Sequence, residues 1–536
     1  MFFKSAFAFS ALFWLVAGVC FVAPLSWIAV TLISNRNALD ELRLDSFRVQ
    51  LLTRTIAYNA SVAVVATLIA IPAAIAIGRG RGIWTKPLLL LLPISLLLPS
   101  IAFEYGWKQT LRLTGAFPSP QSGGDIVRCV WTLAAWLWPI PAAMGAMALR
   151  RVDASILEQA SLDGVLGRMT LRILAKPQAV ACAIVFVLAS QEFAVFEPSG
   201  ISVVATEVRM VFETGAYSSN ENPITQTFGA AGGEPMGSRG QNARAAAAIF
   251  TALPLTVLTI VIAVVVWVAA RRLAVEGEMH VGPRASIVRA PAWVVAVAYL
   301  LIGITSVLPI VAMVMSLQNR VDAVRIWKTF SPQILGSLSL AMMAMCVALC
   351  LSVLQLSRKR RVVIVLASMC FLVGGQMLAI GLIRLFNHQA TAIVYDTFMI
   401  AVLAYVSRFG WLALAGAATT WQRPWVSLRD MAAVDGASSG QILWRVVLPL
   451  AWPTLLAAGL LVGVLSMTEV AATVLLSPQN PQPLVPMLLG WVHLQRYDAM
   501  IEGTLLLCGV VVLAAAAIVG VAWLARRSSI ALGRKS

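Results

Sequence analysis

The sequence contains few charged residues for its length. Charged side chains make up 12% of the 536 residues and hydrophobic side chains 60%, and the mean hydropathy is +0.86. Apolar runs of around 20 residues recur along the chain, and each is long enough to cross roughly 30 Å of hydrocarbon as a helix. The composition therefore excludes a soluble globular protein and predicts an all-α polytopic membrane protein.

Motifs that hold ATP or a catalytic metal are also missing. The sequence has no Gly-x-x-x-x-Gly-Lys-Ser/Thr phosphate loop and no His-Glu-x-x-His pair. Its three histidines, His280, His388 and His493, are far apart in the sequence. We therefore expect this chain to bind no cofactor and no metal, to have no catalytic residues, and not to be an enzyme.

The cysteines and the basic residues point to the membrane as well. All seven cysteines lie in or at the edge of apolar segments, which favours packing over disulfides or metal binding. The formal net charge is +17, but the basic residues cluster at the ends of apolar runs, where they meet lipid headgroups. Because no folded basic domain is present, we expect the lipid bilayer and not nucleic acid as a partner.

Twelve apolar segments are predicted to span the membrane, six in each half of the sequence. The first is too long for the apolar core of a cleaved signal, so we expect it to remain as a span. Two longer polar segments, 199–244 and 476–499, are predicted to be loops on the outer face. The predicted spans are 6–33, 54–78, 87–106, 129–149, 178–198, 245–270, 291–316, 335–356, 362–384, 393–418, 453–475 and 500–525.

One stretch of the sequence occurs twice with the same internal spacing. Residues 158–177 and 430–449 superpose after a shift of 272 positions. Each copy has an acidic residue, a Gly six positions later and a Pro thirteen positions after that Gly. Both copies lie in polar, Arg-containing gaps between apolar runs, which indicates an internal duplication. The matched pairs are Ala160 and Ala432, Asp163 and Asp435, Gly164 and Gly436, Leu171 and Leu443, and Pro177 and Pro449.

The repeated stretch resembles the EAA loop of ABC-importer permeases, whose pattern is Glu-Ala-Ala, three residues, Gly, nine residues and Ile-x-Leu-Pro. Two copies in one chain resemble the fused two-fold permeases of the iron(III), thiamine and related importers. The resemblance covers essentially the whole chain, because each copy occupies a comparable place in its half. The sequence departs from the pattern where Asp430 and Met431 replace Glu-Ala, Gln159 replaces an Ala, and Lys176 replaces the Leu before Pro.

This resemblance implies a fold and a set of partners. The fold would be two homologous six-helix MetI-like halves with about 12 transmembrane helices, residues 1–275 and 291–536, joined by a cytoplasmic linker at 276–290. Two copies of a cytoplasmic ABC ATPase would each dock on one loop, and one periplasmic or extracellular solute-binding protein would deliver the solute. ATP would be hydrolysed by the partner subunit, and the membrane would be the bacterial cytoplasmic (inner) membrane.

The residue types in the two loops suit docking. Small Ala side chains allow close approach of a partner, and in an Asp-Gly turn the Gly tolerates a positive φ. A Pro fits the first turn of the following membrane helix, and an acidic residue near the start of a docking helix interacts well with the helix dipole. The alternative is an ordinary connecting loop. The predicted ATPase-docking residues are Glu158, Ala160, Asp163, Gly164, Pro177, Asp430, Ala432, Asp435, Gly436 and Pro449.

The distribution of Lys and Arg predicts the orientation in the membrane. With the N-terminus inside, the segments on the cytoplasmic side hold 24 of the 40 basic residues. Basic residues are enriched in cytoplasmic loops, so this bias predicts that both repeated loops and both chain termini face the cytoplasm.

Three charged residues inside predicted spans are candidates for the translocation path, because charge is costly in a membrane. Glu192 and Glu469 are predicted to lie on the fifth span of each half, which lines the path in the resembled family. The alternative for both is a hydrogen bond within the helix bundle. Arg408 lies in a Tyr-x-x-Arg-Phe stretch like that of iron-type permeases, and a structural role is favoured over substrate contact. Glu104 and Arg384 are near span ends and are predicted to be interfacial.

The sequence leaves the substrate open. The fused arrangement and the neighbourhoods of Arg408 and Glu469 look most like iron(III) importers, whereas thiamine, phosphonate, sulfate and polyamine importers share the architecture. A second class of function, an ion-coupled secondary transporter, also often has internal repeats but leaves the cytoplasmic repeat unexplained. A third, a membrane-embedded enzyme, would need a cluster of His, Asp or Ser residues that the spans do not offer.

Overall fold

The computed structural model describes residues 11–34, 45–80, 83–115, 123–215, 238–277, 288–317, 322–356, 361–421, 425–476 and 482–533. Within these ranges the chain forms helices and turns and contains no strand. Ten helical runs are long and apolar enough to cross a membrane, or up to twelve if each of two bent helix pairs counts as one span. The all-α prediction is therefore confirmed for the described part of the chain, and the number of long apolar helices suggests a multi-pass membrane protein.

The first part of the chain runs from its first described helix to a long helix that ends at Gly277. Most of the predicted linker 276–290 follows it, and 278–287 lie outside the described residues. The elements are η1 (Gly18–Val22), α2 (Ala23–Ser34), α3 (Ser46–Arg79), α4 (Thr85–Leu91), η3 (Leu92–Leu97), α5 (Ser100–Leu113), α6 (Gly124–Leu137), α7 (Pro139–Arg151), α8 (Ala154–Leu162), α9 (Leu166–Ala189), η4 (Glu197–Ser199), α10 (Val204–Thr214) and α11 (Ser238–Gly277).

The second part of the chain begins with a helix that contains one π-helical turn, as the first part does. Its elements are α12 (Ala292–Ile302), η6 (Gly303–Val307), α13 (Leu308–Met315), α14 (Ala323–Leu356), α15 (Arg361–Val373), α16 (Gly375–Phe386), η7 (Gln389–Thr391), α17 (Ala392–Tyr395), α18 (Met399–Ala418), η8 (Thr419–Trp421), α19 (Trp425–Val434), α20 (Ser439–Gln441), η9 (Ile442–Val447), α21 (Leu448–Met467), α22 (Ala471–Leu476), α23 (Leu484–His493) and α24 (Tyr497–Gly533).

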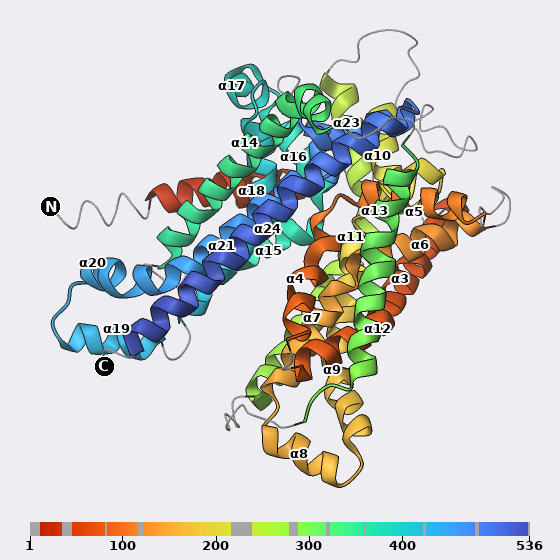
Figure 1. Cartoon of the computed structure of the whole chain (residues 1–536). Helices are drawn as coiled ribbons and strands as arrows, with labels where there is room; N and C mark the ends of the chain where they lie inside the picture. Colours follow the sequence, from red (N-terminus) through yellow and green to blue (C-terminus); the bar gives the residue numbers. More distant parts are fainter. Residues whose placement is uncertain are drawn as a thin grey trace.

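The long helices run between two ends of the molecule. Figure 1 shows α8, α19 and the C-terminal end of α24 at one end, and α10, α17 and α23 at the opposite end. Between these ends, α3, α7 and α9 pack against one another, and α14, α18 and α21 do the same. Both repeated loops therefore lie at the same end of the molecule.

The helix that opens each part of the chain packs on the other part. In the first part, α2 contacts α16; in the second, α12 contacts α3 and α13 contacts α5. The α5–α13 crossing is close at Gly106, where an added Cβ would lie 2.8 Å from Pro309 Cβ and 3.1 Å from Pro309 O. A glycine at this position permits the close approach of the two helices.

We expect Gly106→Ala to destabilise the protein by about 1–3 kcal/mol, because the added methyl group must push against the backbone of α13. Thermal unfolding in detergent would measure the change. The matched control is Gly303→Ala on the same opposing helical run, where an added Cβ has no neighbour within 4 Å among the described residues. Equal stability of the two variants would show that the α5–α13 crossing is not tightly packed.

Two predicted spans are broken in the middle. The pair Pro87–Leu96 and Ser100–Leu113 is bent by 97°, and the pair Arg361–Val373 and Gly375–Phe386 by 105°. Pro99, which has no N–H, precedes α5, and Gly374 adopts a φ of +91° between α15 and α16. Because the backbone groups at such breaks lose their helical partners, other groups in the protein must satisfy them.

The two segments predicted to be outer loops contain helices, so that part of the prediction is wrong. Within 199–244 the structure has α10, whose Val204, Val208 and Val211 are buried. These side chains recur at helical spacing and pack into the bundle, although the surrounding residues favour turns. Within 476–499 the structure has α23, which contacts α24.

Candidate functional site

The chain turns in the same way after α8 and after α19. Three backbone hydrogen bonds close each helix, and they join residues that the shift of 272 positions superposes. Gly164 has a φ of +69° and Gly436 a φ of +81°, which a residue with a Cβ rarely adopts. The predicted turn conformation of both glycines is confirmed. The bonds are Asp163 N–H to Gln159 O (2.9 Å), Gly164 N–H to Ser161 O (3.3 Å) and Val165 N–H to Ala160 O (3.0 Å), and Asp435 N–H to Met431 O (3.0 Å), Gly436 N–H to Ala433 O (3.1 Å) and Ala437 N–H to Ala432 O (3.0 Å).

Both loops expose an apolar side chain at the same position. Leu162 is 88% exposed and Val434 is 87% exposed, and each directly precedes the Asp-Gly turn. Single exposed apolar residues are common on proteins, but a matched pair at the tips of repeated helices indicates a contact surface. Ala160 faces the opposite way and is buried, and Ala432 at the equivalent position is half-buried. The small side chains therefore face the protein itself, and the tips carry the free apolar surface.

The prediction for the two prolines is wrong for Pro177. α9 begins at Leu166, directly after the turn, so Pro177 lies in the interior of a helix and not in its first turn. Pro449 is at the start of α21, but the helical run begins at Ser439 and continues through η9. The polar residues that follow each turn are already helical, so each proline removes a backbone donor within a helical run.

The acidic residues of the loops lie further along their helices than predicted. Glu158 is the fifth residue of α8, which begins at Ala154, and Asp430 is the sixth residue of α19, which begins at Trp425. Their effect on the helix dipole is small there, because it falls off within the first turn. Asp153 is the N-cap of α8 instead, and its carboxylate accepts a hydrogen bond from Ser155 N–H at 3.2 Å.

Arginines hold both loops against the ends of the membrane helices. Arg429 of α19 donates to Leu356 O at 3.3 Å, the last residue of α14, and its guanidinium lies 3.8 Å from the centre of the Trp421 ring. Partial burial lowers the pKa of Arg429, but an arginine stays cationic in proteins. In the other loop, Thr170 of α9 accepts a hydrogen bond at 3.5 Å from Arg79, the last residue of α3. Movement of either loop is therefore coupled to a long membrane helix.

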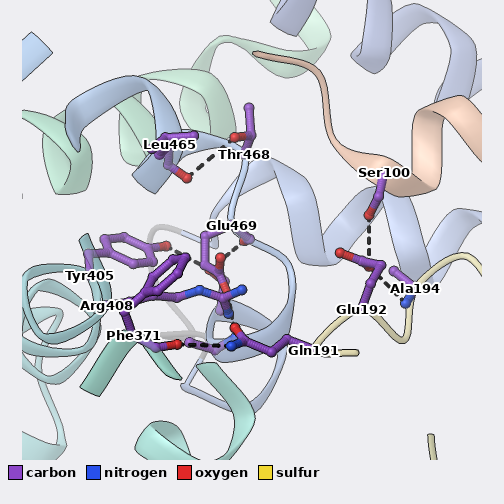
Figure 2. A network of polar contacts seen from close by, with 12 residues as sticks. Ser100, Gln191, Glu192, Ala194, Phe371, Tyr405, Arg408, Leu465, Thr468 and Glu469 are labelled. Atoms are coloured by element: carbon purple, nitrogen blue, oxygen red, sulfur yellow. Dashed lines mark hydrogen bonds and ion pairs between the residues drawn. The ribbon is translucent and has the colours of Figure 1, made fainter. Parts of the chain in front are cut away.

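A buried ion pair joins α18 to the segment after α21 (Figure 2). Arg408 Nη1 lies 2.5 Å from Glu469 Oε1, and the two side chains are 11% and 5% exposed. Glu469 also accepts a hydrogen bond from Ala472 N–H at 3.0 Å. The ion pair requires a glycine at position 375. An added Cβ on Gly375 would lie 1.9 Å from Arg408 Nη1 and would collide with it.

Glu192 also lies in a break of the helical structure. α9 ends at Ala189, so Glu192 is not on a membrane helix as predicted, and α21 likewise ends at Met467, before Glu469. Figure 2 shows the Glu192 carboxylate between Ser100 Oγ, which donates at 2.8 Å, and Ala194 N–H, which donates at 3.1 Å. Both glutamates are hydrogen-bonded within the bundle, and contact with a solute stays a prediction for Glu192, Glu469 and Arg408.

Glu104 and Arg384, which the sequence analysis predicts to be interfacial, are both buried within the protein. Glu104 is 1% exposed and Arg384 is 6% exposed. Glu104 Oε1 lies 3.2 Å from Arg128 Nη2, and Arg384 donates a hydrogen bond to Asn242. Each residue lies on the second helix of a bent pair, and α5 and α16 pack among other helices of the bundle. Whether either residue is at the membrane interface stays a prediction.

Gln191 is a polar contact that the sequence analysis missed. It lies next to Glu192, and its amide nitrogen donates to Phe371 O at 3.0 Å and to Leu372 O at 3.3 Å (Figure 2). These acceptors are 180 and 181 positions further along the chain. A single uncharged glutamine beside an apolar run carries no signal of such a distant pairing.

Comparisons with known proteins and the geometry of possible metal ligands give no further assignment. No protein-family model matches the sequence, and no curated protein matches it. In the part of the chain that the structure describes, no three His, Cys, Asp or Glu residues are grouped so that they could hold a metal ion. The function is therefore argued from the two loops and the interior polar groups.

Proposed function

We propose that this multi-pass membrane protein is the permease subunit of a binding-protein-dependent ABC importer, with two homologous MetI-like halves. The observation that carries the proposal is the pair of loops at one end of the molecule. They share a sequence pattern, the same three closing hydrogen bonds and a matched exposed apolar residue. Two loops of equivalent shape on one chain fit two copies of one partner, because each copy of a symmetric partner presents the same surface.

In this proposal each loop docks in a cytoplasmic ABC ATPase subunit of the bacterial inner membrane. ATP binding draws the two ATPase subunits together, and the arginine contacts of the loops transmit that movement to α3 and α14. A solute-binding protein on the outer side delivers the solute, and the chain itself performs no covalent chemistry. Iron(III) is the substrate that the sequence resemblance favours, with thiamine, phosphonate, sulfate and polyamines as the alternatives.

Photocrosslinking at the loop tips tests the proposal. A photoreactive amino acid would replace Leu162 or Val434 in the full-length chain, in its native membranes. We expect both positions to capture the same soluble protein and mass spectrometry to identify it as an ATPase with a phosphate-binding loop. The matched control is Ile393 on α17 at the opposite end, which is 84% exposed and is expected to capture no ATPase.

Capture of different proteins at the two tips, or of the ATPase at Ile393 as well, would contradict the proposal. Uptake measured in the same cells separates the rival class of function. An ABC importer is expected to keep working when an ionophore collapses the ion gradients and to stop when ATP is depleted. An ion-coupled secondary transporter would show the reverse.

A further inference from the structure

The turn that contains Gln191 connects the two parts of the chain at a helix break. α9 ends at Ala189, and the side chain of Gln191 reaches across to the last turn of α15. α15 stops there because Gly374 has a φ of +91°, so the carbonyl oxygens of Phe371 and Leu372 lack their usual helical donors. The Gln191 amide supplies that donor from the other part of the chain.

A small cavity with both polar and apolar lining lies beside this contact. Its volume is about 40 Å³, and Ser190, Gln191, Thr256, Gly374, Gly375 and Gln376 are among the residues that line it. Gln191 and Gln376 both line this cavity, and Gln191 Oε1 and Gln376 Nε2 are buried and have no hydrogen-bond partner among the described residues. Gln376 is 6% exposed. A side chain with a free acceptor and one with a free donor thus line the same cavity.

The size and chemistry of the cavity fit water. A buried water needs a cavity of roughly 10–15 Å³ or more and at least two polar partners. A water here can accept a hydrogen bond from Gln376 Nε2 and donate one to Gln191 Oε1. Both amides are then satisfied, as buried polar groups in proteins almost always are.

The break between α15 and α16 also lies against the buried Arg408–Glu469 pair. An added Cβ at Gly374 would lie 3.5 Å from Gln191 Cγ, and one at Gly375 would lie 2.7 Å from Glu469 Oε1. The break between α15 and α16 is therefore held between the Gln191 amide and the Arg408–Glu469 pair. Any separation of the two parts of the chain has to break the Gln191 hydrogen bonds at this point.

We propose that this cavity is a water-binding site at the closed constriction of the solute path, and that Gln191 and Gln376 are the groups that a passing solute meets. This inference rests on the proposed function as a transporter. When the two parts separate, the amides and the carbonyl oxygens of Phe371 and Leu372 line the opening. They offer both donors and oxygen acceptors, which suits a small hydrated solute and not an apolar one.

Cysteine labelling tests the constriction without any ATPase. In a full-length chain whose seven native cysteines are replaced by alanine, Ser190→Cys places a thiol at the cavity. The probe is a small charged methanethiosulfonate reagent. We expect Gln191→Leu to raise the labelling rate at this thiol about 10-fold, the factor that corresponds to about 1.4 kcal/mol of lost hydrogen bonding.

The matched control is Gln178→Leu, which changes the same residue type in α9 but loses only a bond to Pro141 O within the first part of the chain. We expect it to leave the labelling rate unchanged. Equal labelling of the Gln191→Leu and Gln178→Leu proteins would overturn the proposal. Thermal unfolding of both variants checks that they are folded.

A second variant keeps the Gln191 hydrogen bonds and changes the cavity alone. Gln376→Leu replaces the amide donor at the cavity with an apolar group, and we expect the maximal rate of iron(III) uptake to fall about 10-fold with unchanged labelling at position 190. Wild-type uptake in this variant would show that the solute does not meet Gln376. If labelling responds as expected but no ATPase docks on the loops, the result supports the proposed constriction and contradicts the proposed ABC importer.

Discussion

Arg408→Met is expected to destabilise the protein by about 3–5 kcal/mol, because it leaves the Glu469 carboxylate buried without its partner. The pair is 2.5 Å apart and both side chains are almost fully buried, so water cannot replace the lost guanidinium. Thermal unfolding of the purified protein in detergent would measure the loss. The matched control is Arg445→Met on an exposed surface, which is expected to change stability by no more than about 0.5 kcal/mol.

A double variant shows whether the pairing itself is the cause. Replacing both partners, Arg408→Met with Glu469→Leu, removes the unpaired charge and is expected to recover most of the stability. A double variant as unstable as Arg408→Met alone would mean that Arg408 acts through other contacts, such as its packing over Phe409. Uptake by a stable double variant then reports on the role of the pair in transport, separately from folding.

Gly164→Pro combined with Gly436→Pro is expected to abolish both ATPase retention and ATP-driven uptake. Proline fixes φ near −65°, whereas these residues have φ of +69° and +81°. It also removes the N–H groups that bond Ser161 O and Ala433 O, and it disfavours the helical conformation of the preceding aspartate. Both loop tips then change direction, and neither is expected to fit the surface of the ATPase.

The measurement is co-purification of the ATPase with the affinity-tagged chain from native membranes. The matched control is Gly167→Ala with Gly440→Ala, at glycines of the same two loops where an added Cβ has no neighbour within 4 Å in the described part of the chain. That control is expected to retain the ATPase. Retention by the proline variant, with normal membrane insertion and thermal stability, would contradict docking through these loops. Each single proline variant is expected to bind the ATPase more weakly than wild type but not to lose it, because one of the two docking loops remains intact.

The sequence allowed the features that depend on local pattern to be predicted. Long apolar runs predicted the spans, and the repeated Asp-Gly dipeptides predicted the left-handed turns at Gly164 and Gly436, because both follow from rules that act over one element. The role of Pro177 was mispredicted, because a local preference for the first helical turn says nothing about where the preceding residues become helical. α9 had already begun eleven residues earlier, at Leu166.

The interior polar contacts depended on tertiary structure and could not be predicted. Arg408 and Glu469 are 61 positions apart, and Gln191 is 180 positions from Phe371. The sequence shows each of them as a polar residue in or near an apolar run, but it does not show which residue each one contacts. The burial of Glu104 against Arg128 was missed because the sequence does not reveal the 97° bend before α5. In each case the missing information was how elements far apart in the sequence pack together.

The contact between α2, part of the first described helix of the chain, and α16 has a consequence for biosynthesis. Ile28 of α2 packs beside Gly381 of α16, with 3.7 Å between Ile28 Cγ1 and an added Cβ on that glycine. A ribosome that adds ~5–20 residues per second needs roughly 20–70 s to make the intervening chain. During that interval α2 has its contacts with α11 but lacks those with α16. Insertion machinery or a membrane chaperone that shelters the uncovered face would raise the yield of correctly assembled protein, whereas a product truncated after the first half would leave that face of α2 permanently uncovered.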